Sequence, residues 1–383
     1  MNGVRRIVFV ITGLGTGGAE MMLLKLLQRL DRQRFEPYVV SLTTAGEIGA
    51  GIGALGIPLT PLGMKPGVPD PRCFFRLVRM LRRLQPDLVH TWMYHADLIG
   101  GVAARLAGVS AIAWCIRHGD FDNGKTAFST RATVRFCAWL SKWVPARIVS
   151  CSERARAVHA AIGYEWEKMV VVPNGFDLGR FKPAADARAE LRAELGLAMG
   201  TPLVGCIGRF DPQKNHAGFF RAAGRLHRKM PHVHFVLAGQ GIDGENSELK
   251  QAVLRAGVGG NTHLLGLRRD MPSVMAALDL LVSSSCFGEA FPNVIGEAMA
   301  CGIPCVVTDV GDSARIVGAT GRVVAKDDMA GLAVALEELL AISVSERTAL
   351  GEQARARVAA HFEIGHVVRR YERFYESMLM RQP

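Results

Sequence analysis

The sequence predicts an α/β fold with parallel sheets, and two stretches carry this prediction. In residues 277–318, apolar segments at 278–282 and 305–308 flank a short helical segment. Near the start, an apolar segment at 7–11 precedes a glycine-rich loop and an apolar helical pattern over 21–30. Two strands joined through one helix form a right-handed unit whose strands run parallel. At 383 residues and 49% hydrophobic composition, the chain is long enough for two domains.

The 277–318 stretch is the most informative. Pro292 suits the first helical position, because its φ is already helical and it has no N–H to leave unpaired. Gly302 can adopt the left-handed turn that ends a helix, and Pro304 prevents its continuation. The loop before this helix therefore lies at the carboxyl edge of the sheet, where open α/β folds bind ligands.

Two carboxylates mark that edge, Glu289 on the loop and Glu297 in the helix. The first helical amides, near Asn293, Val294 and Ile295, lack intrahelical partners and form an anion site suited to a phosphate. Carboxylates beside such a site fit a ligand whose hydroxyls flank its phosphates, as in a sugar nucleotide. The alternative is a helix N-terminus that carries two solvated acids.

The run from Glu289 to Glu297, EAFPNVIGE, is followed by AMACGIPCVVTDVG. It resembles the glutamate-seven-residues-glutamate signature of retaining glycosyltransferases of the GT-B fold, most closely family 4. The resemblance implies two Rossmann-like domains facing across a cleft that holds a nucleotide sugar. It also implies that Glu289 contacts hydroxyls of the transferred sugar and that Glu297 contacts the ribose.

The resemblance extends to other segments and gives the domain boundaries. It implies an acceptor domain at 1–177, a donor domain at 178–363, and a C-terminal helix at 364–383 that crosses back to the first domain. It implies catalytic roles for four residues: His118, Arg209, Lys214 and Glu289. The implied donor-binding residues are Gly15, Gly17, Gly18, Arg209, Lys214, Glu289, Phe291, Pro292, Asn293, Val294 and Glu297.

The glycine-rich loop after the first strand has a second interpretation. Gly13, Gly15 and Gly18 satisfy the G-x-G-x-x-G dinucleotide fingerprint. That fingerprint requires an acid at the end of the second strand, but the segment at 38–42 continues into Thr43 and Thr44. An NAD site is therefore disfavoured. Two interpretations of the loop are left: a tight turn that lets a phosphate approach the backbone, and a turn without a ligand.

Basic residues gather in the first half of the chain. Residues 1–176 contain 22 Lys/Arg and 12 Asp/Glu, a net charge of +10, whereas residues 177–383 contain 24 and 23. The predicted helix at 71–84 places Arg72, Arg76, Arg79 and Arg83 on one face with no acid among them. This pattern fits either an ordinary solvated face or attachment to an anionic membrane surface. No aromatic-basic motif or zinc finger supports nucleic acid as the partner.

His118 follows a buried strand pattern at 110–117, so it is expected at the same edge as the glycine loop. Asp120 and Asp122 match a short acidic metal motif of the other glycosyltransferase fold, but three residues match easily by chance. We therefore expect no metal and no cofactor. The segment 120–128 is expected to form a loop near the acceptor.

In the second half, a strand is expected at 203–207, with Arg209 and Lys214 on its carboxyl side. Two cations there would neutralise a leaving diphosphate, although a pair of solvated cations would have the same sequence. Residues 178–200 are charged and rich in alanine, and we interpret them as a linker with one short helix.

The composition also indicates in which compartment the protein is expected. No apolar run reaches about 18 residues, so no membrane-spanning helix is predicted. The apolar run at the start is too short for a secretory signal, and eight cysteines without metal spacing indicate buried thiols in a reducing compartment. We expect a cytoplasmic protein, with peripheral attachment to the inner face of the cytoplasmic membrane as a hypothesis.

These observations favour a retaining glycosyltransferase that uses a nucleotide-diphosphate sugar, UDP-sugar before GDP-sugar. The expected acceptor is a glycan or a polyprenyl-diphosphate-linked glycan of cell-surface polysaccharide assembly. Glycoside hydrolysis needs a carboxyl with a raised pKa, and a helix N-terminus lowers it. A non-catalytic scaffold of the same fold and a sugar-nucleotide epimerase remain as alternatives.

Overall fold

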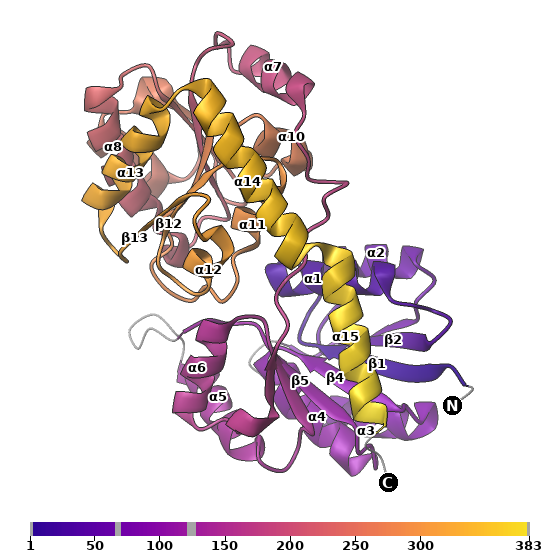
Figure 1. The fold of residues 1–383 in the computed structure, drawn as a ribbon. Coiled ribbons are helices and arrows are strands. Elements are labelled where there is room, and N and C mark those ends of the chain that lie inside the picture. The colour runs from indigo at the N-terminus through magenta and orange to yellow at the C-terminus, as the bar shows by residue number, and fades with distance from the viewer. Residues whose placement is uncertain (1–2, 66–69, 121–127, 381–383) are drawn as a thin grey trace. The chain divides into compact units, whose positions relative to one another are not determined.

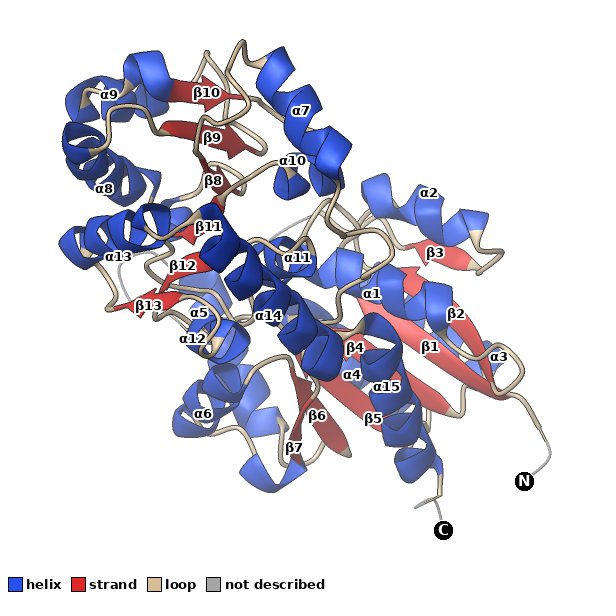
Figure 2. Ribbon diagram, turned by 45° about the horizontal axis from the view of Figure 1, so that its top comes forward, coloured by secondary structure: helices blue, strands red, loops and turns tan. Residues whose placement is uncertain are grey.

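The computed structural model describes residues 3–65, 70–120 and 128–380, which form two compact units (Figure 1). Unit 1 comprises Met1–Gly175 and Ile364–Pro383, and unit 2 comprises Phe176–Glu363. Each unit has a parallel sheet with helices on both faces (Figure 2), which confirms the α/β class. The assignment of one unit to the acceptor and the other to the donor stays a prediction.

Within the described residues, the sheet of unit 1 has seven parallel strands in the order β3-β2-β1-β4-β5-β6-β7. Side chains of β1 alternate between two cores, with Ile7 and Phe9 on one face and Val8 and Val10 on the other. This alternation follows from the two-residue period of a strand. The strands are β1 (Arg5–Ile11), β2 (Phe35–Ser41), β3 (Leu59–Pro61), β4 (Leu88–Trp92), β5 (Ile112–Ile116), β6 (Arg147–Ser150) and β7 (Met169–Val171).

Helices cover both faces of this sheet. On one face pack α1 (Gly18–Arg29), α2 (Gly46–Ala54) and the C-terminal helix α15 (Ile364–Leu379). On the other face pack α3 (Pro71–Leu84), α4 (Tyr94–Leu106) and α5 (Phe128–Leu140). The remaining elements of the unit are α6 (Glu153–Ile162) and the short η1 (Trp166–Lys168). The helix predicted at 71–84 is α3, with the expected bounds.

α15 is held to unit 1 by polar as well as apolar contacts. His90 Nδ1 lies 2.9 Å from the hydroxyl of Tyr375, and both side chains are buried. Val367 and Tyr371 lie in the same core as β1. The last helix of the chain is therefore part of the core that supports the first strand.

The described part of unit 2 has a sheet of six parallel strands in the order β10-β9-β8-β11-β12-β13. Leu281 of β11 lies opposite Gly205 of β8 on one side and Cys305 of β12 on the other. The strands are β8 (Leu203–Ile207), β9 (His234–Ala238), β10 (Thr262–Leu264), β11 (Leu280–Ser283), β12 (Cys305–Thr308) and β13 (Arg322–Val324). The strands predicted at 203–207 and 305–308 are confirmed.

The helices of unit 2 alternate with these strands. The longer ones are α7 (Ala185–Glu194), α8 (His216–Lys229), α9 (Ser247–Ala256), α13 (Met329–Ala341) and α14 (Val344–Phe362). The shorter ones are η2 (Pro212–Lys214), η3 (Gly259–Asn261), α10 (Met271–Ala276), α11 (Asn293–Ala300) and α12 (Ser313–Val317).

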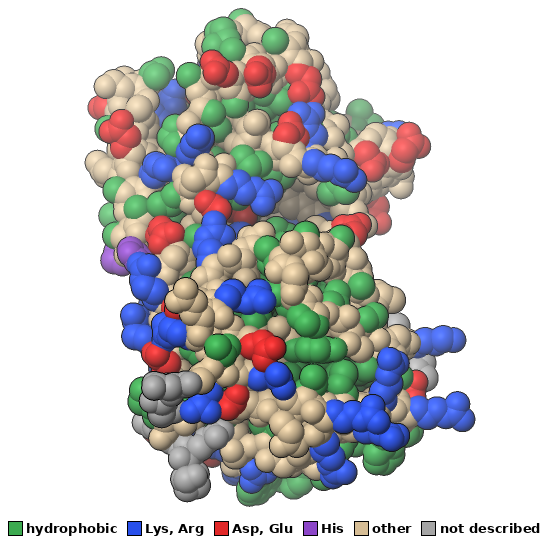
Figure 3. Space-filling view, turned by 90° about the vertical axis from the view of Figure 1, so that its right-hand side faces the viewer, with side chains coloured by type: hydrophobic (Ala, Val, Ile, Leu, Met, Phe, Trp, Pro, Cys, Tyr) green, Lys and Arg blue, Asp and Glu red, His purple; other side chains and the backbone are tan. Residues whose placement is uncertain are grey.

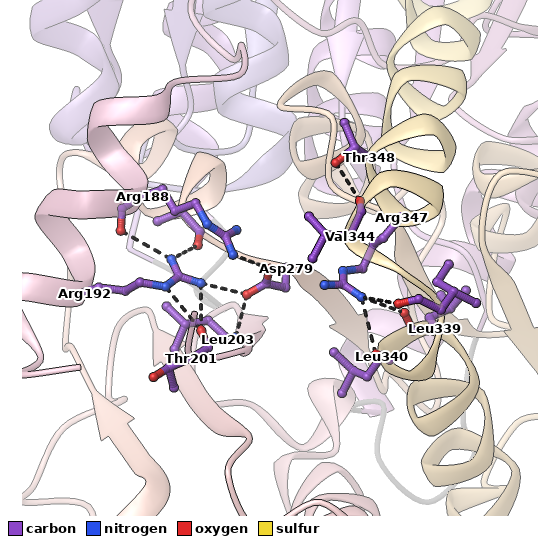
Figure 4. Close-up of polar contacts among 12 residues, drawn as sticks. Arg188, Arg192, Thr201, Leu203, Asp279, Leu339, Leu340, Val344, Arg347 and Thr348 are labelled. Atoms are coloured by element: carbon purple, nitrogen blue, oxygen red, sulfur yellow. Dashed lines mark hydrogen bonds and ion pairs between the residues drawn. The ribbon is translucent and has the colours of Figure 1, made fainter. Parts of the chain in front are cut away.

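The short helix expected within residues 178–200 is confirmed as α7, but the interpretation of the segment as a linker is wrong. Arg192 of α7 is fully buried and donates to Asp279 Oδ2 at 2.7 Å, while Arg188 donates to Oδ1 at 2.7 Å (Figure 4). Asp279 Oδ2 also accepts from the backbone N–H of Leu203 at 2.8 Å. A charged, alanine-rich helix thus packs into unit 2, because its arginines find a buried carboxylate just before β11.

Two local predictions at α11 differ in outcome. Pro292 has φ −67° and ψ 114°, so it caps the helix from outside and Asn293 is the first helical residue. The prediction that Pro292 begins the helix is therefore wrong by one position, and the missing N–H of Pro292 is still harmless there. Gly302 has φ +76°, which confirms the left-handed helix end.

Two compositional predictions can also be compared with the structure. Seven of the eight cysteines are buried and Cys73 is half-buried, which confirms that the thiols are mostly internal. Among the helices of the described residues, none has both the length and the apolarity needed to cross a membrane.

Candidate functional site

In unit 2, the predicted polar residues gather at the carboxyl edge of the sheet. η2 follows β8 and carries Lys214, while the loop after β11 carries Glu289 and leads into α11. β8 and β11 are neighbours in the sheet, so their following loops meet. The backbone joins them as well: Cys286 N–H donates to the carbonyl of Gln213 at 2.9 Å, and Ser284 Oγ donates to the carbonyl of Lys214 at 2.9 Å.

Lys214 and Glu289 form the polar centre of this edge. Lys214 Nζ lies 2.5 Å from Glu289 Oε1, and the side chains are largely buried. An ammonium has three donors, so Lys214 keeps capacity for a second anionic partner while it holds the carboxylate. The structure thus brings together two of the residues for which a catalytic role is predicted.

The ionisation of Glu289 reflects opposing effects. Burial raises its pKa, but the charge of Lys214 and hydrogen bonds from Lys214, Ser285 and Gln213 outweigh burial, so the pKa lies below its ordinary value. Glu289 is only 8% exposed, yet it is ionised at neutral pH. Such a group is an acceptor for hydroxyls and a poor general acid.

The loop that carries Glu289 is held by residues that the sequence analysis did not single out. Ser285 Oγ donates to Glu289 Oε1 at 3.1 Å, and Thr308 Oγ1 donates to the carbonyl of Ser285 at 2.6 Å. A Cβ at Gly311 would lie 2.3 Å from the carbonyl oxygen of Glu289. The run of three serines at the end of β11 was the available signal, since small hydroxyls at a strand's carboxyl end often serve as ligands or supports.

Arg209 lies on the same edge, but its side chain is turned to a neighbour. Its guanidinium pairs with Asp211 at 3.0 Å, and half of the side chain is exposed. Asp211 also caps η2 by accepting from the N–H of Gln213. Gly239, after β9, has a structural use, because a Cβ there would meet the carbonyl oxygen of Gly208.

α11 presents the remaining predicted donor-binding residues. Asn293, Val294 and Glu297 are half-buried in its first two turns, and Pro292 precedes them. Phe291 is buried, with its ring stacked on Phe176 at 6.2 Å and edge-on to Phe362 at 5.3 Å. That these residues contact a donor stays a prediction. The ring of Phe291 is buried in the core of unit 2.

The glycine loop of unit 1 connects β1 to α1. Gly17 caps α1 with extended backbone, and a Cβ there would lie 2.4 Å from Glu20 Oε2. At Gly15, by contrast, a Cβ would meet nothing within 4 Å. The space at Gly15 and the first amides of α1 leave room for a ligand, so the loop is compatible with the predicted role of Gly15, Gly17 and Gly18.

His118 follows β5 at the carboxyl edge of the unit 1 sheet, as predicted. The preceding residue, Arg117, was missed. Its guanidinium donates to Asn174 Oδ1 at 2.6 Å and to Tyr371 Oη at 3.0 Å, and it lies 4.0 Å above the ring of Trp92. Arg117 thereby ties β5 to α15 and fixes the position of the strand end that carries His118.

In the described ranges, no group of three or more His, Cys, Asp and Glu side chains is arranged to hold a metal ion. Asp120 is described, but Asp122 and most of the predicted loop at 120–128 lie outside the described residues. The expectation of a metal-free, cofactor-free site stays a prediction.

Two family models match the chain, one on each half. The model described as Glycosyltransferase Family 4 matches residues 16–180, and the model described as Glycosyl transferases group 1 matches residues 201–341. EpsF of Bacillus subtilis, named as a glycosyltransferase, is 29% identical over 319 residues, which cover 80% of this chain and 79% of that protein. An Escherichia coli UDP-Gal:alpha-D-GlcNAc-diphosphoundecaprenol alpha-1,3-galactosyltransferase is 29% identical over 265 residues, 63% of each chain.

A solved structure shares the fold over nearly the whole chain. Anabaena HepE in complex with UDP and glucose superposes with a TM-score of 0.84 at 23% identity, over 97% of this chain and all of that one. The two family matches, the relatives and this architecture agree with the motif at Glu289. The chain belongs to glycosyltransferase family 4, has the GT-B fold, and is a glycosyltransferase.

Proposed function

We propose that the protein is a retaining hexosyltransferase that takes a UDP-sugar in unit 2 and transfers the sugar to a polyprenyl-diphosphate-linked glycan. The observation that carries this proposal is the pair formed by Lys214 of η2 and Glu289 in the loop before α11, 2.5 Å apart. A half-buried ammonium there can meet a diphosphate while the carboxylate that it holds accepts hydrogen bonds from sugar hydroxyls. The relatives named above support the donor and acceptor classes.

In the proposed reaction, the bond between the anomeric carbon and the diphosphate oxygen breaks. The acceptor oxygen bonds to that carbon from the same face, and the acceptor proton passes to the departing diphosphate. Lys214 and Arg209 neutralise the charge that develops on the diphosphate, and the first amides of α11 add donors. Glu289 orients the sugar, Glu297 binds the ribose, and His118 is a further residue assigned to the sugar. We propose that no metal or cofactor takes part.

The first test is a thermal-shift panel of UDP, GDP, ADP, NAD and UDP- and GDP-sugars. A ligand at about 100 times its dissociation constant adds about 2.7 kcal/mol to stability. We expect stabilisation by UDP and UDP-sugars that Glu297→Ala removes. A response to NAD alone, or none at all, would contradict the proposal.

Turnover is tested separately. Lys214→Ala combined with Arg209→Ala should abolish transfer, and unchanged turnover would contradict the mechanism. Release of UDP that depends on added acceptor distinguishes transfer from epimerisation, and the anomeric configuration of the product, measured by NMR, tests retention. Activity that persists in EDTA is expected.

We also propose that the protein acts at the cytoplasmic face of the membrane that holds its acceptor. The arginine face of α3, with Arg72, Arg76, Arg79 and Arg83, supports attachment to anionic lipid. Salt-sensitive retention on vesicles that contain anionic lipid is the expected result.

A further inference from the structure

Three helices of unit 1, α3, α4 and α5, pack side by side over one face of the sheet and share one core. We refer to them as the helix layer. Together they contain eight arginines and a single acid, Asp97. Asp97 is fully buried, and burial raises its pKa well above the ordinary value, so it adds no negative charge to the surface. The outer surface of the layer therefore carries cations without carboxylates from its own helices.

The same layer exposes a row of aromatic rings. Phe136, Trp139 and Trp143 recur at helical spacing on α5 and its following turn, and their exposed fractions are 49%, 56% and 56%. We call them the aromatic ridge. On α3, Phe75 is 66% exposed among the arginines. Among the described residues, the exposed large aromatic side chains all belong to unit 1.

Rings in the ridge cover one another. Phe136 stacks on Trp139 with centroids 5.6 Å apart and planes at 20°, and Trp139 meets Trp143 edge-on at 4.9 Å. Phe136 and Trp139 each cover one face of the other, which leaves fewer open aromatic faces on which the bases of a single strand could stack. The ridge instead presents a continuous apolar edge with polar indole N–H groups, the chemistry of side chains at a membrane–water interface.

Charge complementarity selects the partner. Arg135 and Lys142 are exposed beside the ridge, and α3 supplies Arg76 and Arg79. Figure 3 shows Lys and Arg side chains gathered on the part of unit 1 that faces the viewer. Cations over an apolar row attract a surface that is anionic at its headgroups and apolar beneath. A second copy of the chain would bring like charges together, which disfavours self-association through this surface.

We infer that unit 1 docks on an anionic lipid surface through the helix layer, with the aromatic ridge entering the interface and the α3 arginines contacting the headgroups. This goes beyond attachment by α3 alone, because it assigns the apolar part of binding to α5. It rests on the proposed function only in that a lipid-linked acceptor would lie in the same surface.

The experiment measures partitioning of the full-length protein onto phosphatidylcholine vesicles with and without phosphatidylglycerol, at low and high salt, together with tryptophan emission. The test variant is Trp139→Ser/Trp143→Ser. The matched control is Leu254→Ser/Leu267→Ser in unit 2, whose side chains are 80% and 68% exposed. A third variant, Trp139→Phe/Trp143→Phe, keeps the apolar character but removes the two fluorophores of the ridge.

Wild type and control should bind anionic vesicles with a blue shift of tryptophan emission and retain part of this binding at high salt. Trp139→Ser/Trp143→Ser should lower the partition coefficient on the order of 100-fold, since two aromatic side chains no longer enter the interface. The Phe variant should bind with little blue shift. Arg76→Gln/Arg79→Gln should weaken binding at low salt and leave the blue shift of the bound fraction.

An unchanged partition coefficient in the Trp139→Ser/Trp143→Ser variant, or no blue shift in bound wild type, would overturn the inference. So would binding of a single-stranded oligonucleotide in place of vesicles, or a dimer in sedimentation that this variant dissociates. Stabilisation by UDP is measured in the same samples and should be equal in all variants. Loss of that response in wild type would reject the proposed donor and leave the vesicle result to decide the docking surface.

Discussion

At Glu289, burial and a neighbouring ammonium act in opposite directions, and the ammonium prevails. A carboxylate whose pKa is lowered on folding stabilises the protein above its unfolded-state pKa, and this stabilisation is lost as pH falls through the lower folded-state value. The ionised state of Glu289, and with it the proposed contact to sugar hydroxyls, therefore depends on Lys214. Removal of that one cation should change the pH at which the site works.

We predict that Lys214→Met lowers kcat/KM at least about 100-fold, as loss of a charged donor to a developing oxyanion does. Without the ammonium, burial raises the pKa of Glu289, so the acid limb of the pH–rate profile should move to higher pH. The control is Lys229→Met, which removes an exposed lysine that pairs with Glu337 at 2.7 Å in the same unit. A profile of Lys214→Met that falls uniformly without moving would show that Lys214 does not set the ionisation of Glu289.

Gly311 and Gly257 allow the effect of backbone strain on stability to be separated from the effect of displacing the backbone of Glu289. Its φ is +61°, and a Cβ would collide with the carbonyl oxygen of Glu289. At Gly257, φ is +68°, but a Cβ would meet nothing within 4 Å. Each Gly→Ala change should lower the free energy of unfolding by about 1–2 kcal/mol, because alanine disfavours the left-handed backbone conformation. Gly311→Ala alone should also weaken UDP-sugar binding in titration calorimetry, and equal affinities in the two variants would reject this role.

Among single residues, those whose side-chain chemistry is distinctive within a motif could be predicted from the sequence. Glu289, Lys214 and the start of α11 meet on one edge because the strand–loop–helix pattern places them there. Arg117 was missed, because it acts through tertiary contacts that sequence spacing does not encode. Ser285 was also missed, although it lies only four residues before Glu289 in a run of serines that offered a local signal. The pairing of Arg209 with Asp211 is local, two residues apart, and the sequence offered it directly.

At the scale of elements, α7 shows how a composition can mislead. Residues 178–200 are charged and rich in alanine, the usual composition of a solvated segment, yet the Arg192 side chain is fully buried. The signal lay far along the chain, in Asp279 just before β11. An apolar strand preceded by a buried acid requires a cation, and only the assembled unit shows that α7 provides it (Figure 4).

We predict that Asp279→Asn destabilises unit 2 by about 3–5 kcal/mol, because it leaves the buried Arg192 without its counter-charge. Urea unfolding followed by circular dichroism measures the change. The control is Glu194→Gln, which removes one partner of the more exposed Arg268 and should cost no more than about 1 kcal/mol. Similar midpoints for Asp279→Asn and wild type would mean that the pair does not hold α7 in place.

At the scale of the whole molecule, periodicity and glycine–proline punctuation were sufficient for the α/β class. Strand patterns of five or so apolar residues, each followed by a helical pattern, can form little else than parallel sheets. The bounds of α3, β8 and β12 follow from these local signals. The strand order could not be predicted in the same way, since it depends on which helices cross each face, and neither could the way α15 completes the core of unit 1.

The residues predicted to bind the donor should become protected when it binds, and hydrogen–deuterium exchange with mass spectrometry measures this protection. We predict that a saturating UDP-sugar slows exchange in three segments: 13–18 in unit 1, and 208–214 and 285–297 in unit 2. UDP without the sugar should protect the amides at the start of α11 and have less effect on the loop that carries Glu289, because the carboxylate is expected to bind the sugar. NAD serves as the control ligand and should protect none of them. Protection confined to unit 2 would remove Gly15, Gly17 and Gly18 from the donor site and leave the glycine loop as a turn that joins β1 to α1.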